Sequence, residues 1–181
     1  MTTYQYDAWI YDEIKQTIRG LFGAGVHLAQ ASRAEDVGGI DACLTVNHRA
    51  QVQLRVRFDR PLYAPDDDIA FRLTEPAMIA AKTYAPLMLY FWMKGRRIVA
   101  GKCVDVYRMA DGIVPPLADR PCIMANDGNG GLRTVRIEEL YASRSILAFY
   151  DGIHWAFPLT NADVRFAVIT SGDPDDLPLP V

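Results

Sequence analysis

The chain has 181 residues, half of them hydrophobic, which suffices for one domain with a substantial core. Its formal net charge is −3, which argues against nucleic-acid binding through an overall basic charge. A local basic stripe could still bind nucleic acid. The three cysteines are widely spaced and form no CxxC pair, so neither a disulfide framework nor a zinc site is indicated.

The first ten residues lack the basic start and apolar run of a signal peptide. The most apolar stretch, 83–93, contains Pro86 and is far shorter than the ~20 residues that a membrane helix requires. We therefore expect a cytoplasmic protein without a membrane segment, in which this stretch is a buried strand.

Apolar residues with a helical period predict a helix over 4–28, with glycines weakening its last turn. Residues 26–31 fit a short strand or a loop equally well, and 137–149 fit a helix or a strand. The clearest strand signal is 51–58, where apolar and polar residues alternate. Further strands are expected over 40–46, 69–73, 84–93, 97–107, 133–137 and 164–169, with turns at 38–39 and 47–49 and a hairpin between 84–93 and 97–107.

No internal repeat or low-complexity linker divides the chain, so 1–181 is expected to be a single domain. The tail, 171–181, combines aspartates with prolines and is expected to be disordered.

Acidic and polar residues follow one another in a distinctive order in the first third. Glu13 lies on the predicted helix, and the segment 35–41 (EDVGGID) brings Asp41 into the first strand after it. Gln53 and Arg55 lie on the alternating strand, with Gln53 twelve positions after Asp41.

This order resembles the active-site core of the restriction-endonuclease-like PD-(D/E)XK superfamily. There, a helix precedes a strand with an invariant Asp and a neighbouring strand with (D/E)-x-K. The stretch is also similar to phage and prophage proteins with an E-D-x-x-G-I-D segment followed by a D-x-K-x-R strand. The resemblance covers 4–73. It implies an α/β fold with a mixed central sheet flanked by helices, followed here by a β-rich C-terminal extension.

The resemblance also implies hydrolysis of DNA phosphodiesters with Mg²⁺ or Mn²⁺. Asp41 matches the metal-binding Asp, and Glu13 and Asp36 match additional metal ligands. Gln53 occupies the place of the second acid and Arg55 that of the lysine. Carboxylate oxygens suit a hard cation, which polarises the phosphate and activates a water molecule.

Two departures from the pattern bear on activity. Gln53 is neutral, so it offers a carbonyl oxygen but adds no ligand charge. Arg55 is permanently protonated and cannot act as a base, although it could clamp a phosphate. With these two residues, Gln51 and Arg57 form a polar strand face that could line a phosphate groove or be a plain solvent-exposed face.

Each candidate also has a structural interpretation. Asp41 could cap a turn or pair with Arg55, and Glu13 and Asp36 could be ordinary helix or turn charges. Two alternative functions follow. One is a catalytically inactive nuclease-fold protein that binds nucleic acid or a host or defence protein. The other is a structural or assembly protein of a phage.

Overall fold

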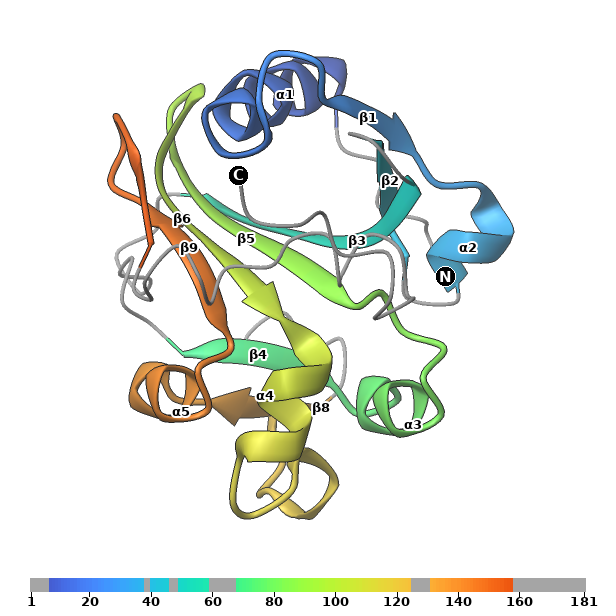
Figure 1. Ribbon diagram of the computed structural model, residues 1–181. Coiled ribbons are helices and arrows are strands. Elements are labelled where there is room, and N and C mark those ends of the chain that lie inside the picture. The colour runs from blue at the N-terminus through green and yellow to red at the C-terminus, as the bar shows by residue number, and fades with distance from the viewer. Residues whose placement is uncertain (1–6, 38–39, 46–48, 59–67, 125–130, 158–181) are drawn as a thin grey trace, which may run out of the picture.

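The computed structural model describes residues 7–37, 40–45, 49–58, 68–124 and 131–157, and its centre is a seven-stranded sheet (Figure 1). The strand order is β1-β2-β3-β5-β6-β9-β10. Neighbouring strands are antiparallel except β3 and β5, which are parallel, so the sheet is mixed but mostly antiparallel. Its strands are β1 (His27–Gln30), β2 (Ala42–Thr45), β3 (Arg49–Phe58), β5 (Leu87–Lys94), β6 (Arg97–Asp105), β9 (Ile146–Tyr150) and β10 (Trp155–Ala156).

A second, three-stranded antiparallel sheet has the order β4-β8-β7, with β4 (Ile69–Arg72), β8 (Gly131–Val135) and β7 (Ile123–Met124). The helices are α1 (Ala8–Phe22), α2 (Arg33–Val37), α3 (Glu75–Ala80), α4 (Val106–Gly112) and α5 (Ile137–Ala142), with a 3₁₀ turn, η1, at Leu117–Asp119. Helix α1 lies on one face of the central sheet, whereas α3, α4, α5 and the small sheet lie on the other (Figure 1).

The central sheet therefore separates two hydrophobic cores. The first lies under α1, where Ile14 and Ile18 pack against β3 and β5. The second lies between the central sheet and the small sheet, and it contains Phe71 and Met109. Strand β5 is buried along both faces up to Lys94, which explains its unbroken apolar sequence.

The first helix is shorter than its apolar period predicts. It ends at Phe22 because Gly23 adopts a positive φ of 90°, a conformation that residues with a side chain rarely adopt. The chain then forms β1 instead of continuing the helix, which settles the open choice for 26–31 in favour of a strand. Leu28, the last residue of the predicted helix, thus belongs to β1 and packs in the first core.

The predicted hairpin between the strands over 84–93 and 97–107 is confirmed, with Gly95 at a φ of 60° in its turn. The second strand ends earlier than expected, because Asp105 accepts a hydrogen bond from the Arg108 backbone and caps α4. Residues 137–149 contain both elements that their pattern suggested, α5 followed by β9.

The short helices α2, α3 and α4 were not predicted from the sequence. The turn predicted at 38–39, the strand predicted at 164–169 and the tail at 171–181 lie outside the described residues. So do two residues of the turn predicted at 47–49, whose third residue, Arg49, begins β3.

Within the described ranges, none of the helices is long and apolar enough to cross a membrane.

Candidate functional site

Asp41 lies immediately before β2, at one end of the central sheet. Its backbone extends the strand ladder, because its N–H donates to the Val52 carbonyl at 3.0 Å and its own carbonyl accepts from Ala31 N–H at 3.0 Å. The Tyr11 hydroxyl of α1 lies 3.5 Å from the same carbonyl. The backbone of Asp41 is thus fixed between β1 and β3, and its half-buried side chain is directed by its own hydrogen bonds.

The Asp41 carboxylate is bound to the neighbouring strand β3. Its Oδ2 accepts from Gln53 Nε2 at 2.5 Å and from Leu54 N–H at 2.9 Å. Gln53 is 4% exposed, and its Oε1 is a buried acceptor with no hydrogen bond in the described part of the chain. The structure therefore brings Asp41 and Gln53 together, and among the described residues the buried Gln53 Oε1 has no hydrogen-bond donor.

Burial raises the pKa of Asp41 from 3.8 to about 6. The Arg55 charge and the hydrogen bond from Leu54 N–H act in the opposite direction, and the Asp36 carboxylate raises the pKa further through its charge and a hydrogen bond. Asp41 therefore holds a proton more strongly than an ordinary aspartate does.

The short helix α2 positions Asp36 beside the Asp41 carboxylate. The helix begins with a reciprocal cap, in which Ser32 Oγ accepts from Glu35 N–H at 3.4 Å while Glu35 Oε2 accepts from Ser32 N–H at 2.8 Å. Ile40 N–H then donates to the Glu35 carbonyl at 3.0 Å and leads the chain into β2. The EDVGGID segment thus places Asp36 next to Asp41.

Arg55 lies two residues after Gln53, on the same face of β3. Its Nη2 donates to Glu75 Oε1 in an ion pair and lies 3.3 Å from the Tyr84 hydroxyl. The side chains of Arg55 and Glu75 are 14% and 8% exposed, so the pair is largely shielded from water. The guanidinium is therefore held beside the Asp41 group and is not free in solvent.

The structure locates Glu13 elsewhere. Its Oε1 accepts from Ile98 N–H at 3.0 Å, and Ile98 pairs with Met93 near the far end of β5. Asp41 precedes Ala42, which pairs with Val52, so it is level with Met88 near the start of β5, roughly 17 Å along the strand from Met93. Glu13 also lies on α1, on the other face of the sheet, and is thus not brought to Asp41.

The polar face of β3 is exposed to solvent only in part. Gln51, at one end, is exposed, whereas Gln53 is covered by the second layer. Arg57 Nε donates to the Tyr90 hydroxyl at 3.0 Å, with its guanidinium carbon 5.6 Å from the Tyr90 ring centre. Gln51 and Arg57 thus extend the face without joining the Asp41 group.

Sequence reasoning did not select Glu75 or Tyr84 for this group. Glu75 opens α3, and its Oε2 also accepts from Arg72 N–H at 2.7 Å. Tyr84 precedes β5 and is fully buried, and desolvation raises the pKa of its hydroxyl. In the sequence, Glu75 directly precedes Pro76, and an acid and a proline in the first turn are typical of the start of a helix. We use the name site cluster for Asp36, Asp41, Gln53, Arg55, Glu75 and Tyr84.

In the described part of the chain, no three His, Cys, Asp or Glu side chains gather as a metal site. The site cluster offers two adjacent carboxylates and the unsatisfied Gln53 oxygen. These are hard oxygen donors, which suit a cation such as Mg²⁺ that keeps several of its water ligands.

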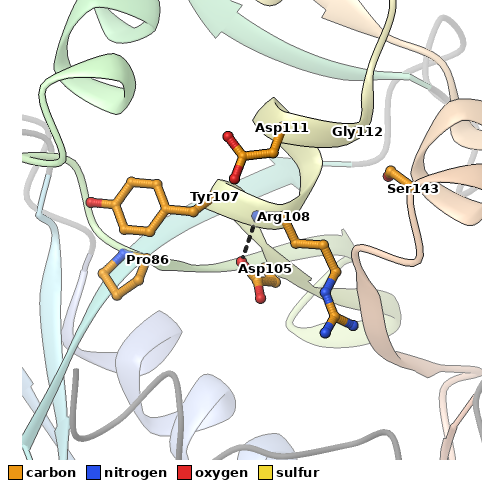
Figure 2. Close-up of a pocket in the computed structure, with 7 residues that line it drawn as sticks. All are labelled: Pro86, Asp105, Tyr107, Arg108, Asp111, Gly112 and Ser143. Carbon is orange, nitrogen blue, oxygen red and sulfur yellow. Dashed lines mark hydrogen bonds between the residues drawn. The ribbon is translucent and has the colours of Figure 1, made fainter. Parts of the chain in front are cut away.

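A separate open pocket of about 490 Å³ lies over α4, at the same end of the sheet (Figure 2). Asp105 and Arg108 line it, and the dashed line in Figure 2 marks the cap of α4. Asp105 is the last residue of β6 and pairs with Leu87 of β5, and β6 lies two strands beyond β3 in the sheet. None of the residues selected from the sequence lines this pocket.

No protein-family model matches the chain, and neither the curated proteins nor the solved structures include one that matches it.

Proposed function

We propose that this protein is a nuclease-like protein of restriction-endonuclease type, possessing a divalent-cation site at Asp36 and Asp41 and acting on DNA phosphodiesters. The observation that carries this proposal is the convergence of Asp36, Asp41, Gln53 and Arg55 at one end of the sheet. These residues come from α2, from the position just before β2 and from β3, in the order that the sequence resemblance implies.

The residues fit a hard cation. Two carboxylates supply negative charge, and the buried Gln53 Oε1 lacks a hydrogen-bond donor in the described part of the chain. A bound Mg²⁺ or Mn²⁺ would supply Lewis acidity and lower the pKa of a coordinated water molecule. Gln53 would orient Asp41 through its Nε2 hydrogen bond, and Arg55 would face the phosphate as a fixed positive charge.

Calorimetric titration with Mg²⁺ and Mn²⁺ tests the cation site. We expect binding by the wild type and a loss of about tenfold or more in affinity for Asp41→Asn and for Asp36→Asn, because each change removes one ligand charge. Asp111→Asn, which neutralises an exposed acid on α4, is the matched control and should bind as the wild type does.

A plasmid-nicking assay on the same samples tests the reaction. Nicking that needs the cation and disappears in Asp41→Asn supports hydrolysis. Wild-type protein that binds neither cation refutes the enzymatic proposal.

A second candidate is a catalytically inactive protein with the same fold that binds nucleic acid or a protein. The Arg55–Glu75 ion pair favours it, because the charge that would meet a phosphate is already neutralised. Cation binding without nicking, together with retention of DNA in a gel-shift assay, would distinguish this candidate from the nuclease.

A further inference from the structure

Glu75 is buried, although it begins a short helix and carries a charge. It is the first residue of α3, yet its side chain is 8% exposed and reaches Arg55 on β3 of the central sheet. One carboxylate oxygen pairs with Arg55 and the other accepts from Arg72 N–H at 2.7 Å. Both oxygens are thus engaged, so the carboxylate is held in one orientation.

Arg55 interacts with two acidic residues. It is paired with Glu75, and its charge also acts on Asp41. A guanidinium that paired with Asp41 would occupy the carboxylate that a cation needs and would oppose the approach of positive charge. The fixed Glu75 carboxylate provides Arg55 with a competing partner.

We propose that Glu75 is a positioning residue that holds the Arg55 guanidinium and thereby keeps the Asp36 and Asp41 carboxylates available to a divalent cation. The Tyr84 hydroxyl, 3.3 Å from Arg55 Nη2, is a second contact that limits the guanidinium. This role rests on the proposed cation site and adds a residue from α3 to it. Glu75 touches neither cation nor substrate; it acts through Arg55.

The first test is the cation affinity of Glu75→Gln, measured by calorimetry with Mg²⁺ and Mn²⁺ at pH 8. The substitution keeps the shape of the side chain and removes its charge. We expect affinity to fall ten- to hundredfold, the range found for residues that orient metal ligands. The same substitution in an Arg55→Met background should change affinity less than threefold, because the competing guanidinium is gone. An equal loss in both backgrounds would overturn the proposal.

The Arg120–Glu139 pair provides a matched control. It is also a buried ion pair, at 2.6 Å, with side chains 8% and 16% exposed, but it joins the residue after η1 to α5 and lies outside the site cluster. Glu139→Gln should destabilise the fold while leaving cation affinity unchanged. A loss of affinity in this control equal to that in Glu75→Gln would show a general effect of destabilisation and would overturn the specific role of Glu75.

A crystal structure of cation-free Glu75→Gln separates this inference from the proposed function. We expect the Arg55 guanidinium to move onto the Asp41 carboxylate. If it moves while the wild type binds no cation, the arrangement of charges is as inferred and the cation site fails. If it stays in place, Glu75 does not position it, whatever the wild type binds.

Discussion

Asp41 combines a half-buried side chain with a raised pKa, and this combination affects stability. Its pKa rises from 3.8 to about 6 on folding, mainly because burial disfavours the charged form. The folded state therefore binds the proton more tightly than the unfolded chain. The stabilising contribution of protonated Asp41 is fully present below pH 3.8 and is lost as the pH rises through about 6.

Asp41→Asn should consequently stabilise the protein at pH 8, by up to about 3 kcal/mol, and have little effect at pH 3. The asparagine oxygen can still accept from Gln53 and Leu54. Urea unfolding of both proteins across this pH range measures the difference. A stabilisation that does not depend on pH would show that ionisation of Asp41 is not its cause.

The same protonation should control cation binding. Because a cation must displace the proton from Asp41, its affinity should weaken by up to about tenfold for each pH unit below 6 and level off above it. Calorimetry at pH 5, 6, 7 and 8 measures this dependence. A flat profile would place the cation away from Asp41.

The pKa of Glu139 is shifted in the opposite direction, so its contribution to stability has the opposite pH dependence. Hydrogen bonds from Arg120 lower its pKa from 4.5 to about 2, so its stabilising contribution is present above pH 4.5 and lost as the pH falls toward 2. Glu139→Gln should lower the free energy of unfolding by about 3 kcal/mol at pH 7, because Arg120 stays buried without its counter-charge. Urea unfolding at pH 7 and at pH 2 tests this, and the two proteins should converge at pH 2.

At the scale of elements, the contact between β5 and β6 depends on a small residue. A Cβ built on Gly101 would lie 2.7 Å from a ring carbon of Phe91, which belongs to the first core. Gly101→Ala should therefore destabilise the protein by about 1–3 kcal/mol through overpacking.

Thermal unfolding of Gly101→Ala measures this cost, and adding Phe91→Leu should recover part of it by making room. If the double variant is less stable by the sum of the two single effects, the clash with Phe91 is not the cause.

Local sequence patterns predict which residues form a strand, but they do not predict what covers its polar face. The alternation in β3 predicted a strand, and Val52, Leu54 and Val56 do face the first core. The opposite face could not be assigned in this way, because a polar face on one strand fits solvent and a buried second layer equally well. Helix α3, invisible to periodicity in its six residues, covers that face through Glu75 and thus decides its environment.

For the molecule as a whole, two cores share one sheet. Ile14 in the first core and Met109 in the second are both fully buried. Each substitution by Ala should cost about 2–5 kcal/mol. Because the residues lie on opposite faces of the sheet, the double variant should lose the sum to within about 0.5 kcal/mol. Calorimetric scans should show a single transition in every variant, and two transitions would mean that the faces unfold separately.

The sequence by itself determined the mixed α/β character, the buried strand β5, its hairpin with β6, and the order of Asp36, Asp41, Gln53 and Arg55. These features follow from local periodicity and spacing, which a single chain segment carries. Only the tertiary structure decided the parallel pairing of β3 with β5, the distance of Glu13 from Asp41, and the Arg55–Glu75 pair. Each of these joins segments far apart in the chain, and which partners meet is set by how the layers pack.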